Sequence, residues 1–491
     1  MRSEQKLVSV VNFMIPADFP LRLLRAAMPP QLRVVGGGPA PGTAPAPRPP
    51  RGGRLRRGFS ALAHRNYRLY LGGQIVSLVG TWMQSVSQPW LVLLLGGTPI
   101  QLGIVLALQF TPPMLLAPLG GVLADRVDKR KVLMGTQVLA MLQATALFTL
   151  TFSGVVEIWH VFVLAAVLGT VSAVEMPVRQ AFAAELVPGD DLVNAIALNS
   201  ATFNAARIIG PAIAGVTLAL FGPAANFGIN AVSYLGVLTG LWLMDPAGLH
   251  RVQRPTQVAS VLSSLAEGVR YAVREPSILW PLVLLGGVSL FGMNFQTLLP
   301  LFARNSLGLD AGAYGAMWAI MGIGSLAGSL YLAFSDQRRR LAWLIIGGGA
   351  AFAVFELLMG LFPVVAFAFP AIVVMGLGSM LMINTINVTI QNAVSHELRG
   401  RVMSLYVTVF AGSTPFGGLL AGSLAELFGP ARAFAIGAAA SLVILGLVAW
   451  RLLSTGALRQ VERPSTLPRG DERSDRGGPS PSGEAGRAAS A

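Results

Sequence analysis

The chain contains an internal duplication, in which the same short sequences return about 207 residues later. Residues 221–224 read Phe-Gly-Pro-Ala, and residues 428–431 repeat them. Gly215 and Gly422 lie equally far before the two copies. Further pairs with almost the same separation are Gly169 with Gly376, and residues 120–131 with residues 328–339. Many secondary transporters consist of two homologous halves, each long enough for several membrane spans, so the duplication predicts a membrane transporter.

The composition indicates a location in a lipid bilayer. Of the 491 residues, 53% are hydrophobic and 12% are charged, which is about half of the ~25% charged residues of a soluble protein. Cysteine is absent, which excludes disulfides and Cys-ligated metals. The four histidines are scattered along the chain, which argues against a clustered catalytic site. The phosphate-binding sequence Gly-x-x-x-x-Gly-Lys-Ser/Thr is also absent. We therefore predict no metal, no cofactor and no enzymatic activity.

Twelve apolar stretches are each close to the ~20 residues that cross a hydrocarbon core. They predict an all-α membrane protein with two pseudo-symmetric six-helix halves. The predicted spans are 69–95, 101–123, 132–153, 158–178, 194–221, 224–244, 277–302, 312–334, 341–361, 364–388, 403–428 and 431–453. The predicted domains are a disordered basic extension (1–57), the two halves (58–244 and 277–453), a cytoplasmic linker between them (245–276) and a disordered tail (454–491). A wrongly assigned start codon is an equally good account of residues 1–57.

The net charge of +14 is explained by topology rather than by nucleic-acid binding. Connections on one side of the predicted membrane carry fourteen Lys or Arg residues, and those on the other side carry two, Arg304 and Arg432. Basic residues beside spans mark the cytoplasmic side. We expect both termini in the cytoplasm of a bacterium, with the spans in its inner membrane and the lipid bilayer and a small-molecule substrate as partners.

The connection between the second and third spans resembles the signature of the major facilitator superfamily. Residues 121–131 contain the Gly, Asp-Arg and basic residues of that signature, with Asp128 where the family has a second glycine. The resemblance implies a cytoplasmic latch in which a carboxylate meets a helix N-terminus, a contact worth ~0.3–1 kcal/mol. The alternative is a solvated turn that only fixes topology. The residues expected in this latch are Gly121, Asp125, Arg126, Lys129 and Arg130.

A second resemblance lies in the fifth span, where Gly210, Pro211 and Gly215 are similar to the Gly-Pro motif of exporters in this superfamily. Proline removes a helix donor and glycine permits close packing, so the motif predicts a kink against a neighbouring helix. A kink that serves packing alone is the alternative. Residues 59–68 and 398–404 look like the branch that contains enterobactin exporters and secretion-type permeases. The resemblance implies a monomeric transporter.

Polar side chains within the apolar spans indicate where a substrate could bind, because such groups are costly unless they face protein or water. Several lie at helical spacing on the first, seventh and tenth spans, which line the central cavity in the family that the chain resembles. The candidates are Gln74, Ser77, Thr81, Gln84, Gln88, Asn294, Asn384 and Asn387. The alternative is that these groups bond neighbouring helices to one another.

Charged residues within the spans are few. Arg207 is the one basic residue deep in a predicted span, and Glu175 is a candidate partner for it. The hypothesis is that Arg207 binds an anionic group of the substrate and that Glu175 couples transport to protons; a structural ion pair is the alternative. Glu356, in the ninth span, is expected to face a neighbouring helix.

These observations predict proton-coupled export of a small amphipathic metabolite, siderophore or drug by alternating access. The proton gradient is the expected energy source. An importer of a small nutrient is the alternative.

Overall fold

The structure is a computed structural model that describes residues 59–250, 261–334, 341–395 and 398–454, without the side chains of residues 117–126, 261–265 and 453. The two predicted disordered segments lie outside the described residues, apart from the first residue of the tail. In the described part all regular structure is helical. The helices are η2 (Ser60–Ala63), α4 (Arg65–Leu94), α5 (Pro99–Arg126), α6 (Lys129–Phe152), α7 (Ile158–Ala183), η3 (Gly189–Asp191), α8 (Leu192–Leu243), η4 (Pro246–Gly248), α9 (Val261–Arg274), α10 (Pro276–Phe291), α11 (Phe295–Leu301), η5 (Phe302–Ser306), α12 (Ala311–Phe334), α13 (Leu341–Leu361), α14 (Val365–Ala393), α15 (Arg399–Phe428) and α16 (Pro430–Ser454).

The helices have the lengths and composition of membrane spans. Among the described residues, ten helical segments are long and apolar enough to cross a bilayer. One of them contains α8, whose 52 residues include a non-helical glycine and so make two passes. The 30-residue α4 is more polar and corresponds to the first predicted span. With α8 counted twice and α4 added, these helices match the twelve predicted spans, and the predicted fold class is confirmed.

The repeated Phe-Gly-Pro-Ala sequence makes the same reversal twice. Gly222 (φ 74°) separates the two passes of α8, and Gly429 (φ 85°) separates α15 from α16. This region of positive φ is open to glycine and strained for other residues. The following Pro223 and Pro430 occupy a first helical turn, where the missing N–H costs nothing. The duplication seen in the sequence is therefore a duplicated turn.

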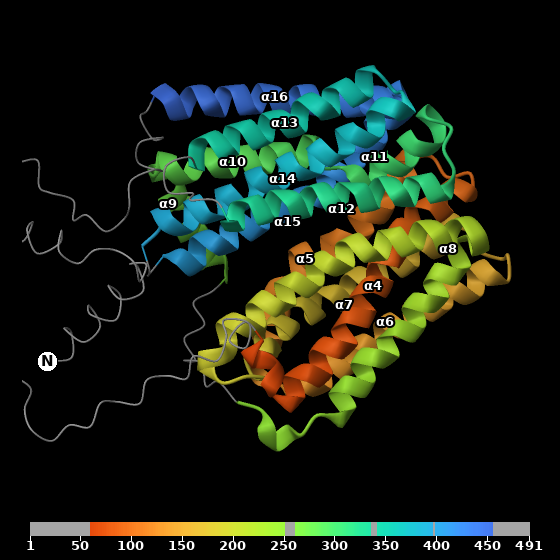
Figure 1. Ribbon diagram of the computed structural model, residues 1–491. Coiled ribbons are helices and arrows are strands. Elements are labelled where there is room, and N and C mark those ends of the chain that lie inside the picture. Colours follow the sequence, from red (N-terminus) through yellow and green to blue (C-terminus); the bar gives the residue numbers. More distant parts are fainter. Residues whose placement is uncertain (1–58, 251–260, 335–340, 396–397, 455–491) are drawn as a thin grey trace, which may run out of the picture. The chain divides into compact units, whose positions relative to one another are not determined.

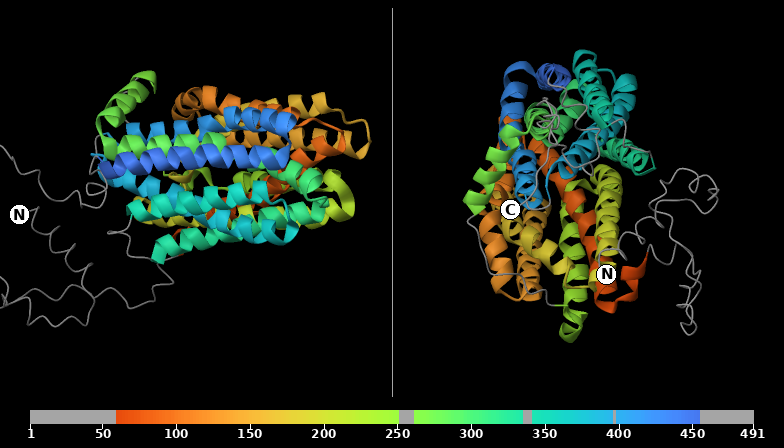
Figure 2. Two further views of the ribbon diagram at one scale, coloured as in Figure 1. Left: turned by 90° about the horizontal axis from the view of Figure 1, so that it is seen from above. Right: turned by 90° about the vertical axis from the view of Figure 1, so that its left-hand side faces the viewer.

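The helices form two groups that correspond to the two halves of the sequence. In the first, α4 packs on α8, α5 on α7, and α6 on both α7 and α8. In the second, α14 packs on α12 and α13, and α16 on α10 and α13. The groups meet where α5 contacts α15, α8 contacts α12 and α4 contacts α11 (Figures 1 and 2).

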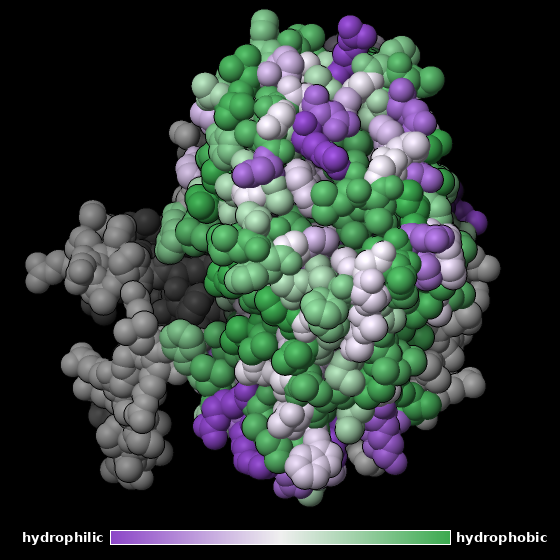
Figure 3. All heavy atoms as spheres, turned by 90° about the vertical axis from the view of Figure 1, so that its right-hand side faces the viewer, coloured by the Kyte–Doolittle hydropathy of each residue, from purple (hydrophilic) through white to green (hydrophobic). Residues whose placement is uncertain are grey.

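The two ends of the helical bundle differ in charge. We call one the basic end; among others it carries Lys129, Arg130, Lys131, Arg179, Arg270, Arg274, Arg399 and Arg401. The other, the far end, carries the five glycines that have positive φ among the described residues, namely Gly96, Gly154, Gly222, Gly308 and Gly429. Figure 3 faces the far end and shows hydrophilic residues as separate patches among hydrophobic ones.

Many large apolar side chains point outward along the helices. Leu220 is 69% exposed, Trp242 is 69% exposed and Phe334 is 87% exposed. In water this surface would be unfavourable by about 25 cal/mol per Å². Hydrocarbon tails remove that penalty, so the exposed apolar side chains agree with a bilayer location.

Candidate substrate cleft and the contacts that close it

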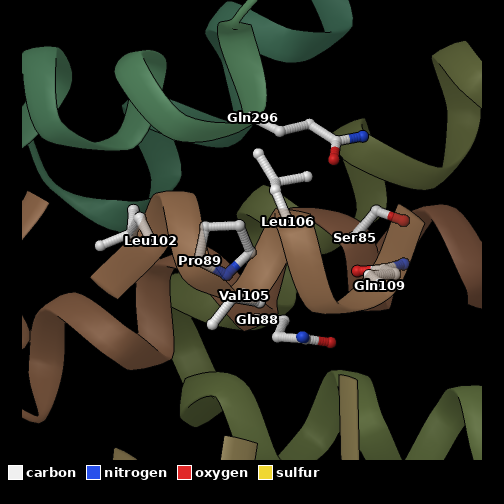
Figure 4. Close-up of a pocket in the computed structure, with 8 residues that line it drawn as sticks. All are labelled: Ser85, Gln88, Pro89, Leu102, Val105, Leu106, Gln109 and Gln296. Atoms are coloured by element: carbon white, nitrogen blue, oxygen red, sulfur yellow. The ribbon is translucent and has the colours of Figure 1, made fainter. Parts of the chain in front are cut away.

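A narrow cleft lies between the two halves, close to the far end. In this conformation its cavity measures about 10 Å³, which is room for about one water molecule. It is lined from α4, α5 and α11 by Ser85, Gln88, Pro89, Leu102, Val105, Leu106, Gln109 and Gln296. In Figure 4 the polar ends of Ser85, Gln109 and Gln296 lie on one side of it, with Leu102 and Pro89 on the other. Gln88 is 3% exposed, and its Nε2 has no hydrogen-bond partner among the described residues. The cleft thus combines amide groups with an apolar wall.

The polar face of α4 divides between this cleft and the interior of the first half. Gln84 donates from Nε2 to Oε1 of Gln143 (3.2 Å) and accepts from Nδ2 of Asn230 (2.8 Å). These bonds tie α4 to α6 and α8, which is the helix-bonding role that the sequence left as an alternative. Gln74 and Ser77 are 6% and 5% exposed, within the α4 packing.

The remaining predicted cavity residues also bond helices or their own turn. Thr81 donates to the carbonyl of Ser77 (2.9 Å). Asn294 donates from Nδ2 to the carbonyl of Leu290 (2.8 Å), at a break between α10 and α11. Asn384 donates to Oγ of Ser329 (3.3 Å), and Asn387 accepts from Gln391 (2.6 Å). Of the predicted set, Gln88 lines the cleft, and a substrate contact for the others stays a prediction.

Two cleft residues, Gln109 and Gln296, are absent from the sequence prediction. Each is an amide within a span, a signal of the kind used to select the others. They lie on different halves of the sequence, so only the fold shows that they share a cleft.

The predicted charged pair is not formed as expected. Glu175 is within 3.5 Å of Arg179, one turn along α7, rather than beside Arg207. Arg207 lies on α8, and its Nε is buried without a hydrogen-bond partner among the described residues. Its backbone packs against Gly322 of α12, at the junction of the halves. An arginine with an unsatisfied nitrogen at this junction can still receive an acceptor from a ligand.

The latch region at the basic end ties helices of the first half together. Lys129 Nζ is 2.7 Å from Oε1 of Glu185, which follows α7. Arg130 donates to the carbonyls of Leu241 (2.7 Å) and Trp242 (2.9 Å), near the C-terminus of α8. The side chains of Asp125 and Arg126 lie outside the described residues, and Gly121 belongs to the same segment, so the latch role of these residues stays a prediction.

Two glycine crossings bring the halves together near the far end. At the crossing of α8 and α12, a Cβ built on Gly315 would lie 2.1 Å from Cα of Gly215. At the crossing of α5 and α15, a Cβ on Gly103 would lie 2.6 Å from the carbonyl oxygen of Gly418. Backbone atoms occupy both positions, so only glycine permits this approach. The Gly-Pro segment of the fifth span thus has a packing role, and Gly210 packs against α4 in the same way.

Polar contacts add to these crossings. Arg304 Nη1 donates to the carbonyl of Leu93 (2.5 Å), across the junction of the halves. The amide of Ile100 donates to Oε2 of Glu426 (3.0 Å). Trp90 and Tyr314 stack with ring centroids 5.1 Å apart. The far end is therefore closed by contacts between the halves.

Comparison with known proteins identifies the family. Residues 56–468 match the family described as transmembrane secretion effector, a group of major facilitator superfamily transporters. The chain belongs to this family. No group of three or more potential metal ligands occurs among the described residues.

Relatives in this superfamily cover most of the chain. The staphyloferrin A transporter of Staphylococcus aureus is 28% identical over 370 residues, which are 75% of this chain and 92% of that protein. The enterobactin exporter EntS of Citrobacter koseri is 26% identical, over 83% of this chain and 96% of that protein. The multidrug efflux pump Tap of Mycolicibacterium fortuitum is 27% identical, over 78% and 94%.

A solved structure shares the fold. The bacterial homologue of the human lysosomal transporter Spinster superposes with a TM-score of 0.61 and 16% identity, over 85% of this chain and all of that one. At this identity the likeness establishes the arrangement of helices alone. The family match, with this arrangement of helices, makes the chain a multi-pass transporter of the major facilitator superfamily.

Proposed function

We propose that the protein is a proton-driven exporter of small amphipathic molecules of the siderophore or drug kind. The relatives support this substrate class, since their names refer to staphyloferrin A, enterobactin and multidrug efflux. The proposal includes a monomer in the bacterial cytoplasmic membrane, with no nucleic acid partner. The observation that carries it is the arrangement of two halves that touch at one end, which these relatives share as members of one transporter superfamily.

The charge of the basic end supports its placement in the cytoplasm, with both termini. With that orientation the far end faces outward, and its contacts close the cleft to the outside. Alternating access then requires the two glycine crossings to separate while the basic end closes. The α8–α12 crossing and the α5–α15 crossing are equivalent to each other in the two halves. A rocking motion of one half against the other would therefore separate both crossings together.

The cleft would have to widen to admit a substrate, which it would then recognise through both kinds of lining group. Gln88, Gln109 and Gln296 offer amide donors and acceptors, while Leu102 and Val105 offer apolar surface. Arg207 would bind an anionic group of the substrate, in line with its unsatisfied nitrogen. Proton coupling by Glu175 stays a prediction.

Metabolite profiling by mass spectrometry tests the direction of transport. Cells that produce the wild-type chain are compared with cells that produce Asp125→Asn at matched levels, with and without a protonophore. We expect a compound that accumulates outside only with the wild type and no longer does so with the protonophore. Accumulation inside the cells would establish import and contradict the proposal.

Replacement of Arg207 tests the substrate class. With the exported compound in hand, Arg207→Ala is compared with Arg207→Lys, which keeps the charge. We expect export of an anionic compound to fall with alanine and to be partly kept with lysine. Equal export by Arg207→Ala and the wild type would remove Arg207 from substrate binding.

A further inference from the structure

Glu356 of α13 is a buried acid without a partner. Its relative exposure is 0%, and neither carboxylate oxygen has a hydrogen-bond partner among the described residues. A carboxylate in apolar surroundings is strongly disfavoured unless it is paired, so an unpaired buried acid takes up a proton. A proton on Glu356 would remove this unfavourable charge in the conformation seen here.

The carboxyl group faces a break in the seventh span. α10 ends at Phe291 and α11 begins at Phe295. A Cβ built on Gly292 between them would lie 3.0 Å from Oε2 of Glu356 and 2.9 Å from Oγ of Ser441. An acid, a hydroxyl and an interrupted helix thus meet at one point inside the second half.

The break is a defined local structure. The amide of Met293 donates to the carbonyl of Val288 (3.0 Å), five residues back, instead of four. Asn294 supplies a side-chain donor to the carbonyl of Leu290 in place of a backbone N–H. The end of α10 carries the negative pole of the helix dipole, which disfavours a carboxylate beside it and favours the neutral acid. Interrupted spans of this kind hold coupling ions in other secondary transporters.

Among the residues that the structure describes, the helices around Glu356 bring no basic group to its depth that could neutralise it. The sequences of α10, α11 and α14 have no titratable residue, and Glu356 is the one such residue in α13. α16 has Arg432 at its exposed start and Arg451 near its other end, where Arg451 lies over the rings of Trp280 and Trp450. The proton is therefore the natural partner of Glu356.

We propose that Glu356 is a proton-carrying site of the transport cycle, coupled to the halves through the break between α10 and α11. The inference rests on the proposed function for its role in export. Glu356 lies five residues before the end of α13 at the far end, about 7.5 Å along the helix axis. Glu356 would take up a proton when the far end opens. It would release this proton to water after the far end has closed and the break between α10 and α11 has rearranged. The structure then corresponds to the protonated state before release.

Infrared spectroscopy of the purified full chain in lipid nanodiscs tests the protonation itself. Spectra between about pH 5 and about pH 9 are compared for the wild type, Glu356→Gln and the control Glu157→Gln, which changes an exposed acid. We expect a carboxylic-acid carbonyl band that fades as the pH rises, is missing in Glu356→Gln and remains in Glu157→Gln. A band that survives in Glu356→Gln would overturn the assignment.

Distances between spin labels test the coupling. Because the chain has no cysteine, Ser153→Cys and Val364→Cys place one label on each half at the far end. We expect the distances to change over the same pH range, and Glu356→Gln to stay in the low-pH distribution throughout. The proposal would be contradicted if the label distances of the parent protein did not change with pH. It would also be contradicted if the distances in Glu356→Gln changed with pH as they do in the parent. A change that requires Na⁺ in place of K⁺ would contradict it as well, since the site would then bind a metal cation.

Neither the infrared nor the spin-label measurement needs a substrate or depends on the direction of transport. The proposal for Glu356 and the proposal of an exporter can therefore be refuted independently of each other. Import in place of export would leave the protonation of Glu356 intact. Conversely, protonophore-sensitive export that persists unchanged in Glu356→Gln would remove Glu356 and keep the exporter. The expected result for this variant is loss of that export, with facilitated exchange of the compound retained.

Discussion

Replacing Gly315 with alanine is expected to open the far end. The new Cβ would lie 2.1 Å from Cα and 2.7 Å from the backbone nitrogen of Gly215, whereas carbon atoms in contact are ~3.5–4.0 Å apart. Neither group is a side chain that could rotate away. The backbones of α8 and α12 must therefore separate by about 1.5 Å at the crossing, or the closed arrangement must be abandoned.

The size of the effect follows from the cost of overpacking. Forcing extra atoms into a well-packed contact costs ~1–3 kcal/mol. Since the clash exists only while the far end is closed, this cost shifts the balance between closed and open forms by about 5–150-fold. Gly103→Ala, at the other crossing, meets the carbonyl oxygen of Gly418 at 2.6 Å and should act in the same direction.

The labels on Ser153→Cys and Val364→Cys measure this balance directly. We expect Gly315→Ala to increase the population of longer distances. The control is Gly347→Ala on α13, because a Cβ there meets nothing within 4 Å. A distribution for Gly315→Ala equal to that of the control and the parent would refute the role of the crossing as a contact that closes the far end.

Three further predictions concern contacts between elements. Hydrogen bonds from Ser60 and His64 lower the pKa of Asp191 below its ordinary value of 3.8. These bonds therefore stabilise the fold fully above that value, and the stabilisation is lost as the pH falls through the lowered pKa. The thermal unfolding temperatures of Asp191→Asn and the wild type should become equal in that acidic range, and a difference that does not change with pH would contradict this. Asn230→Ala removes a bond to Gln84 and should lower the free energy of unfolding by about 0.6–1.7 kcal/mol, measured by denaturant titration; an unchanged midpoint would place the stabilising bonds elsewhere. Arg304→Ala removes a hydrogen-bond donor between the halves and should lengthen the distances between the far-end labels, and Arg304→Lys should restore them in part. Equal distances in Arg304→Ala, Arg304→Lys and the parent would exclude this bond as a contact that closes the far end.

The duplication can be read from the sequence because the turn that it repeats depends on local chemistry. A glycine with positive φ followed by a proline that begins a helix is the same solution at Gly222 and Gly429, and its repetition reveals the duplicated fold. The twelve spans follow from apolar length alone. Each of these two features, the turn and the span, is determined by a stretch of at most about twenty consecutive residues.

The site is less predictable because it depends on contacts between distant segments. Gln84 and Gln88 are one turn apart on α4, yet Gln84 bonds α6 and α8 while Gln88 lines the cleft. Helical spacing places both on one face without showing which neighbour that face meets. Likewise, the partner of Glu175 is Arg179 on its own helix, which the spacing allowed, while the expected pairing with Arg207 required a knowledge of packing.

Transport into inside-out membrane vesicles is the sharpest test of proton-driven export by this protein. The compound found by metabolite profiling is added outside the vesicles, and an imposed pH gradient makes their interior acidic. We predict that vesicles with the wild-type chain concentrate the compound inside and lose it when the gradient is collapsed. Vesicles without the protein should not concentrate the compound. Accumulation that is indifferent to the gradient, or that occurs only in right-side-out vesicles, would contradict a proton-driven exporter.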